Sequence, residues 1–280
     1  MGYKTIVTVA DTMRHAQPVT DFALSIAQQF SAHLIGLRAE GLATVPLIAP
    51  MEIPDPTAIE MLQKAAQDET HRIETLFRAR ATQEGVSHEW RTYVCSAGYG
   101  SQSVLECART SDLIIACQTD PRHGHDGNAE LETLLMESGR PLLLVPYVLT
   151  TPAPLRRVLI AWNGSKEAAR AAFDALPLLK QADSVEIFCV DPPGMPRQAP
   201  ELAGADLAAA LARHDVKVTL RTEENLEIST ADAIENRLTD ASVDLLVMGG
   251  YGHARWWEML FGGVTRSILD TMTAVTLISR

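Results

Sequence analysis

An internal duplication limits the folds open to this chain of 280 residues, because its second half repeats the pattern of its first. The run "YKTIVTVAD" at the start resembles "LRRVLIAWN" after the middle, and each leads into a helical pattern. Further pairs follow in the same order: "AHLIGLRAE" with "SVEIFCVD", "SDLIIACQ" with "VDLLVMGG", and "RPLLLVPY" with "AVTLISR". Matching order over about 130 residues indicates two copies of one structural unit.

Within each copy, short apolar runs alternate with helical segments. Continuous apolar runs such as "DLLVM" are typical of parallel strands that are covered on both faces. Alternating strands and helices predict a doubly wound α/β sheet, with five strands and about four helices in each half. The linker "YVLTTPAP" contains two prolines and divides the chain into domains 1–149 and 154–280. A long helical pattern from Thr57 to about Gly85 distinguishes the first half.

The stretch "GGYGHARWWEMLFGGVTRS" concentrates five glycines in two clusters around two tryptophans. Its first cluster, Gly249–Gly252, ends a predicted strand, and ligands of open α/β sheets sit beyond the carboxyl ends of strands. Its second cluster, Gly262–Gly263, precedes a helical pattern, and a helix start attracts anions. The stretch therefore fits a sugar at the first cluster and phosphates at the second. Glycines at such places also serve tight turns alone, and the spacing leaves both readings open.

The stretch resembles the nucleotide motif of the universal stress proteins, which is G-x-x-G, nine residues, then a glycine followed by Ser or Thr. Gly249, Gly252 and Gly262 fill the glycine positions with matching gaps. The resemblance covers both halves, so the chain is similar to a tandem universal stress protein. It implies two doubly wound domains, each a five-stranded, mainly parallel sheet flanked by helices, of the adenine nucleotide alpha hydrolase-like type. It also implies that the last strands of the two halves meet, as in an internal pseudo-dimer.

The resemblance further implies an ATP site in the second domain. Residues that close the first, second and fourth strands of that domain would border adenine and ribose, and residues around the last helix start would surround the phosphates. These residues are Ala161, Trp162, Asn163, Val190, Met248, Gly249, Gly252, Gly262, Gly263, Val264 and Thr265.

Two residues depart from the motif. Gly263 stands where the family has Ser or Thr, so one hydroxyl donor is lost. Asn163 stands where the family has Asp at the end of the first strand, and an amide serves neither as a carboxylate base nor as a charged metal ligand. In the first half, "CQTDPRHGHDG" replaces the glycine motif although Asp11 is kept. The first domain is therefore not expected to bind ATP in the manner of the family.

Composition narrows the classes of partner. The formal net charge is −11 and no long basic run occurs, so neither a nucleic acid nor an anionic membrane is an expected partner. The four cysteines form no C-x-x-C pair and no cluster with zinc spacing, which predicts reduced, buried thiols and no metal site. With no secretion signal and no membrane-spanning run in the sequence, a cytoplasmic protein is expected.

Three functional hypotheses follow. The leading hypothesis is an ATP-binding stress-response protein whose nucleotide changes its shape or its choice of an unknown protein partner, with a homodimer as an open possibility. The second is an interaction module in which Gly263 and Asn163 mark a lapsed site. The third is an enzyme of nucleotide chemistry. No catalytic residue is assigned, and Ser165 is predicted to cap a helix; slow ATP hydrolysis with Mg²⁺ is the most that these residues support.

Overall fold

The computed structural model describes residues 2–42, 55–95, 100–120, 122, 131–190, 204–224, 227–250 and 263–280. The chain forms two compact units. The N-terminal unit consists mainly of Tyr3–Ser138, and the C-terminal unit mainly of Gly139–Leu149 with Ala153–Arg280. The boundaries of these units reflect which residues contact one another, and they place Gly139–Leu149 with the second half of the sequence. The division into domains 1–149 and 154–280 therefore stays a prediction.

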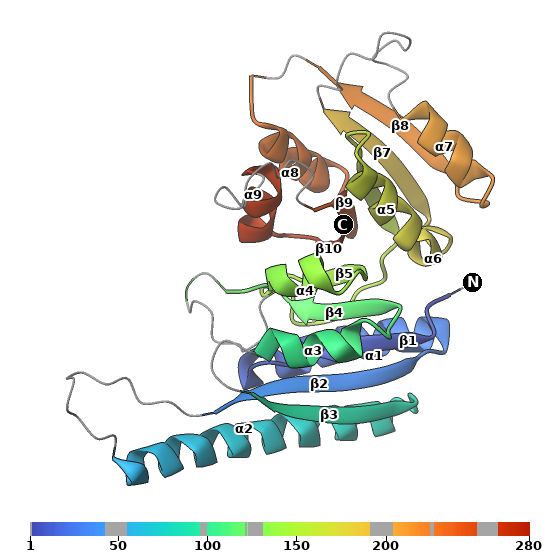
Figure 1. The fold of residues 1–280 in the computed structure, drawn as a ribbon. Coiled ribbons are helices and arrows are strands. Elements are labelled where there is room, and N and C mark those ends of the chain that lie inside the picture. The colour runs from blue at the N-terminus through green and yellow to red at the C-terminus, as the bar shows by residue number, and fades with distance from the viewer. Residues whose placement is uncertain are drawn as a thin grey trace. The chain divides into compact units, whose positions relative to one another are not determined.

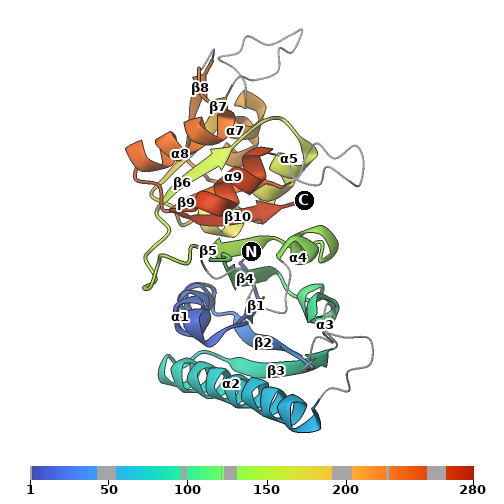
Figure 2. The same ribbon diagram turned by 90° about the vertical axis from the view of Figure 1, so that its left-hand side faces the viewer.

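The N-terminal unit is a parallel sheet in the order β3-β2-β1-β4 (Figure 1). Helices α1 and α2 contact each other on one face of this sheet, and α3 and α4 contact each other on the opposite face (Figure 2). Its elements are β1 (Thr5–Val9), α1 (Met13–Phe30), β2 (His33–Gly41), α2 (Pro56–Gln83), β3 (His88–Cys95), α3 (Gly100–Ala108), β4 (Leu113–Cys117) and α4 (Leu131–Glu137).

The C-terminal unit is a sheet in the order β5-β10-β9-β6-β7-β8. All its strand pairs are parallel except β5 with β10, which is antiparallel. Helices α5 and α7 lie on one face and α8 and α9 on the other (Figures 1 and 2). Its elements are β5 (Leu142–Val145), β6 (Arg157–Ala161), α5 (Lys166–Asp174), α6 (Leu176–Leu179), β7 (Ser184–Val190), α7 (Ala205–Ala212), β8 (Val218–Glu223), α8 (Thr230–Asp240), β9 (Leu245–Gly249), α9 (Gly263–Thr271) and β10 (Val275–Ser279).

Strand β5 comes from the first half of the sequence and pairs with β10, the last strand of the second half. Leu142 lies opposite Ile278, and Leu144 lies opposite Thr276. The predicted meeting of the last strands is therefore confirmed. The pairing also covers one edge of β10, which would otherwise present unpaired backbone groups to solvent.

The apolar runs of the sequence form the central strands, because a sheet with helices on both faces buries every residue of such a strand. Strands β5 and β10 are buried along their whole length, and β4 and β9 are buried up to their last residue. The predicted doubly wound α/β class is confirmed. Within the described residues, no helix combines the length and the apolar character needed to span a membrane.

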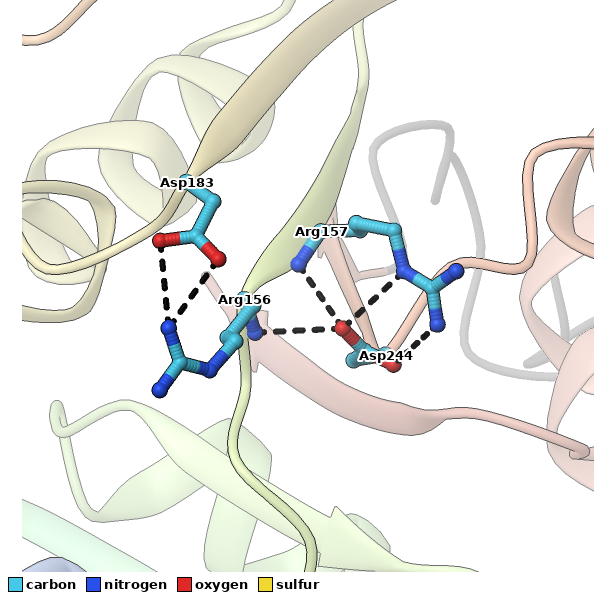
Figure 3. A network of polar contacts seen from close by, with 4 residues as sticks. All are labelled: Arg156, Arg157, Asp183 and Asp244. Atoms are coloured by element: carbon cyan, nitrogen blue, oxygen red, sulfur yellow. Dashed lines mark hydrogen bonds and ion pairs between the residues drawn. The ribbon is translucent and has the colours of Figure 1, made fainter.

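An aspartate before the fourth strand of each half ties that strand to the first strand. Asp112 accepts hydrogen bonds from the backbone amides of Lys4 and Thr5 at 2.7 and 3.0 Å. Asp244 accepts in the same way from the amides of Arg156 and Arg157 at 3.1 and 2.8 Å (Figure 3). The Arg157 guanidinium also donates to Asp244 at 3.0 Å. The repeated carboxylate fixes neighbouring strands at their amino ends.

Replacing Asp244 with asparagine is expected to cost about 1–2 kcal/mol of unfolding free energy at neutral pH, because the charge-assisted bonds are lost. Burial alone would raise the pKa of Asp244, but the bonds from Arg157 and Arg156 outweigh it, and the pKa lies below its ordinary value of 3.8. The stabilisation is thus complete above pH 3.8 and is lost as the pH falls through the lower pKa of the folded protein. Urea unfolding of wild type and Asp244→Asn at pH 7, 4 and 3 should show the difference shrinking below pH 4.

Asp183 provides a matched control for this prediction (Figure 3). It also pairs with an arginine, at 3.1 Å from Arg156 Nη1, but both side chains are largely exposed. Exposed pairs of this kind contribute about 0–1 kcal/mol. Asp183→Asn should therefore leave stability nearly unchanged at every pH. An equal loss in both variants would contradict the anchoring role of Asp244.

Candidate functional site

The carboxyl ends of β6, β7 and β9 bring most of the predicted strand-end residues to one edge of the C-terminal sheet. Ala161 is level with Met248 of β9 and with Phe188 of β7. Val190 ends β7 two residues further along, and Gly249 ends β9. Adjacent parallel strands thus place these residues side by side, as the sequence predicted for a ligand-binding edge.

The turn after β6 is built by Asn163 and Ser165. Asn163 is exposed, and its Oδ1 accepts a hydrogen bond from the Ser165 amide at 3.0 Å. Ser165 Oγ in turn accepts from the Ala168 amide at 3.1 Å and caps α5. The predicted capping role of Ser165 is confirmed. Asn163 has an uncharged amide, and the hydroxyl oxygen of Ser165 is engaged in capping α5. Neither side chain is therefore suited to act as a general base.

Trp162 extends the pairing of β6 with β7 by one bond, because its amide donates to the Phe188 carbonyl at 2.9 Å. Its ring lies close to Gly204, the residue before α7: an ideal Cβ on Gly204 would come within 3.3 Å of the Trp162 ring. Gly204 also has a φ of 84°, a backbone conformation that favours glycine. Trp162 therefore contributes a half-buried aromatic wall beside the edge.

Gly249 is fixed by helix packing. An ideal Cβ on Gly249 would lie 2.4 Å from the Ala168 amide nitrogen and 2.6 Å from the Glu167 carbonyl carbon. The first turn of α5 therefore rests directly on the end of β9, and only glycine allows this approach. The sequence suggested close approach of a ligand as the reason for this glycine; the structure supplies packing as a sufficient reason.

Helix α9 begins at Gly263, and its first turn contains Val264 and Thr265. Because β9 and β10 are parallel and α9 connects them, its start faces the same edge as the end of β9. Gly263 is exposed, an ideal Cβ there would meet nothing within 4 Å, and Thr265 is buried. The first turn of α9 carries no acidic residue, whereas α8 starts with a capping box of Ser229 and Asp232.

Two residues of the predicted set, Gly252 and Gly262, lie outside the described residues, as do His253 and Arg255 between them. The remaining members fall into two groups at the same edge. One group closes β6, β7 and β9, and the other starts α9.

Comparison with known proteins rests on structure. No protein-family model matches the sequence, and no curated protein matches it. A universal stress protein from Archaeoglobus fulgidus DSM 4304 matches with a TM-score of 0.73 at 14% identity, covering 99% of this chain and 96% of that chain.

The chain has the fold of a tandem universal stress protein. A Pseudomonas aeruginosa UCBPP-PA14 protein described by the same family name matches with a TM-score of 0.59 at 17% identity, over 99% of this chain and 93% of that chain. A protein of unknown function from Pseudomonas aeruginosa PAO1 matches with a TM-score of 0.57 at 16% identity, over 99% and 92%. At these identities the likeness establishes the fold.

The two halves of this universal stress protein fold differ at the position of Gly249. Leu113 is level with Ile6 of β1, as Leu245 is level with Val158 of β6. Counting along the strands, Cys117 of β4 takes the place of Gly249. A side chain therefore stands in the N-terminal unit where the C-terminal unit has only backbone, which agrees with the loss of the glycine motif there.

Glu167 is a residue of this edge that the sequence did not single out. It lies in the first turn of α5 directly above Gly249, and its side chain is only 6% exposed. Its ion pair is with the exposed Lys166 at 3.6 Å. From sequence alone, an acid in the first turn of a helix is expected at the surface, where it interacts with the helix dipole. No pattern in the chain indicates that close packing of α5 on Gly249 buries this side chain.

The cysteines are expected to react slowly in the folded protein. Burial raises the pKa of Cys117 to about 12 and that of Cys189 to about 11. Burial also raises the pKa of Cys95 and Cys107. Because the thiolate is the reactive form, a thiol reagent at pH 8 should modify the native protein slowly and all four cysteines after denaturation. Rapid modification of a thiol in the native state would contradict this.

Among the described residues, no cluster of His, Cys, Asp or Glu could hold a metal ion.

Proposed function

We propose that the C-terminal unit binds an adenine nucleotide, with ATP as the expected ligand, and that the bound nucleotide governs a stress-response interaction with a protein partner. The observation that carries the proposal is the switch point between β6 and β9. These strands are neighbours, yet β6 connects through α5 on one face and β9 through α9 on the other. Such a point opens a crevice at the carboxyl edge, where nucleotides bind in doubly wound sheets.

The residues at this edge fit the parts of a nucleotide. The start of α9 offers backbone amides and the positive end of a helix dipole to phosphates, with no acid in its first turn to compete. The half-buried Trp162 and Val190 offer apolar surface to a base. The proposal includes Mg²⁺ bound mainly by the phosphates of ATP, because the uncharged side chain of Asn163 would not hold the ion by itself.

The proposed activity is binding, with ATP hydrolysis slow at most. Asn163 carries no charge, and Ser165 Oγ already serves as the cap of α5. Neither therefore activates a water molecule or attacks a phosphate. A cytoplasmic location and assembly into a homodimer belong to the same proposal and await their own tests.

An interaction module with a lapsed nucleotide site is the second candidate. The observation that favours it is the packing of Gly249 beneath α5, which explains this glycine without any ligand. The absent hydroxyl at Gly263 and the absent charge at Asn163 point the same way. The two candidates differ in one measurable property, the affinity for ATP.

Restoring the hydroxyl at position 263 is expected to strengthen ATP binding. A serine side chain fits there, because an ideal Cβ on Gly263 meets nothing within 4 Å. One added hydrogen bond to a phosphate is worth about 0.5–1.5 kcal/mol, so Gly263→Ser should bind ATP about twofold to twelvefold more tightly than wild type by calorimetry.

Gly263→Ala is the matched control, since it adds the same Cβ without the hydroxyl. It should bind ATP like wild type. If serine and alanine change the affinity equally, the hydroxyl does not reach a phosphate and the proposed placement of the phosphates at α9 is wrong.

A further inference from the structure

Arg38 is a buried cation in the N-terminal unit, apart from the proposed nucleotide site. It lies on β2, its side chain is 5% exposed, and its Nη2 donates to Glu69 Oε2 of α2 at 2.8 Å. Its Nε and Nη1 are fully buried and have no hydrogen-bond partner within the described part of the chain. Buried guanidinium donors are costly to leave unpaired, so this group is suited to a further acceptor.

The same Glu69 also occupies the start of α1. Its Oε1 accepts a hydrogen bond from the backbone amide of Met13, the first residue of α1, at 3.0 Å. Thr12, at the cap position, makes no side-chain cap bond, and the first turn of α1 contains no acid. Burial alone would raise the pKa of Glu69, but the bonds from Met13 and Arg38 outweigh it and hold the pKa below its ordinary value. Glu69 is thus an anion held at a helix start.

A guanidinium and a helix start therefore converge on one carboxylate, which is the donor arrangement of an anion site. We propose that Arg38 and the start of α1 form a phosphate site in the N-terminal unit, in which Glu69 is the resident anion that a phosphate group displaces. This site is independent of the proposed ATP site in the C-terminal unit.

The donors favour phosphate over a second carboxylate. The two oxygens of Glu69 take one donor each from Met13 and Arg38, and the Nε and Nη1 groups of Arg38 remain over. A phosphate has further oxygens, so it can take a second donor of the same guanidinium, Nε or Nη1, while keeping the bonds that Glu69 makes. Arginine matches phosphate in this way because its donors form a planar fork.

The neighbouring acids require that phosphate replace Glu69 and not bind beside it. Glu40 lies on the same strand as Arg38, with its oxygens held by Gln63 Nε2 at 3.1 Å and Thr70 Oγ1 at 2.7 Å. Asp11 follows Ala10, whose amide donates to the carbonyl of Leu37 at 3.0 Å, so this acid also lies close to the strand that carries Arg38. With these acids present, phosphate enters only as Glu69 leaves.

Glu69 has a route out. Its side chain is 32% exposed, so it can rotate toward solvent while α2 stays folded. Arg72, whose charge also acts on Glu69, is exposed and can receive the displaced carboxylate.

The test is a titration of the full chain with inorganic phosphate. Binding is measured by calorimetry and by the change in the ¹⁵N chemical shift of the Met13 amide. Wild type should bind phosphate weakly, in the millimolar range, with a shift at Met13. Glu69→Ala, which removes the competing anion, should bind about tenfold to a hundredfold more tightly. The double variant Glu69→Ala with Arg38→Met should lose this binding. Succinate should bind Glu69→Ala more weakly than phosphate.

Glu74→Ala is the matched control, because Glu74 is an acid of similar exposure on the same helix that pairs with Arg78. It should bind phosphate like wild type. Glu69→Gln serves if the alanine variant does not fold. The proposal is overturned if folded Glu69 variants bind phosphate no better than Glu74→Ala, if the double variant retains the gain, or if the Met13 amide does not respond.

Discussion

Replacing Gly249 with alanine is expected to lower the unfolding free energy of the C-terminal unit by about 3 kcal/mol, or roughly 10 °C in melting temperature. The added Cβ would lie 2.4 Å from the Ala168 nitrogen and 2.6 Å from the Glu167 carbonyl carbon. Both are backbone atoms of α5, so no side chain can rotate away and the helix itself must shift. Thermal and urea unfolding would measure the loss.

Gly263→Ala is the control for this effect as well. Both substitutions add one methyl group beside the proposed site, but the methyl at position 263 meets nothing within 4 Å. Its effect on stability should stay within about 0.5 kcal/mol. If Gly249→Ala is as stable as Gly263→Ala, α5 does not rest on β9 as described.

Replacing Gly36 with alanine should destabilise the N-terminal unit by about 2 kcal/mol. An ideal Cβ on Gly36 would lie 2.5 Å from Trp90 Cε3 and 2.8 Å from the Phe77 ring. Phe77 is completely buried, and the two rings pack with centroids 5.3 Å apart, so neither can move freely. Unfolding followed by tryptophan fluorescence would report the change.

A double-mutant cycle isolates the clash. Trp90→Val removes the ring atom nearest to the new methyl group and has its own cost. If the clash is the cause, Gly36→Ala should cost at least about 1 kcal/mol less in the Trp90→Val background than in wild type. Strict additivity of the two costs would show that Gly36 matters for another reason.

The central strands could be predicted from the sequence because burial on both faces demands continuous apolar runs. Strands β1, β4, β9 and β10 are such runs. Five strands were expected in each half, but the sequence ranges of β3 and β8 were not located. In β3 most residues are half-buried or exposed, and in β8 half-buried and exposed positions alternate over the first four residues, so neither forms an apolar run. Each pairs with one neighbour at an end of the strand order of its unit, so among the described strands only one of its sides is paired.

The edge that gathers the candidate site was predictable, but the packing around it was not. Parallel strands must bring Ala161 and Met248 level, because both close apolar runs of matched length. That Gly249 supports α5, and that Glu167 is buried there, depends on how closely a helix approaches a strand whose last residue, Gly249, lies 82 positions after Glu167. The Arg38–Glu69 pair likewise joins residues 31 positions apart, and no local pattern marks it.

Nucleotide binding by the C-terminal unit is decided by calorimetric titration of ATP into the full chain after any bound nucleotide has been removed. We expect one ATP per chain with a dissociation constant below about 1 mM, and loss of binding in Gly252→Val, which places a bulky side chain at a glycine of the motif. A folded wild-type protein that gives no heat at millimolar ATP would contradict nucleotide binding, and two ATP per chain would contradict its restriction to the C-terminal unit.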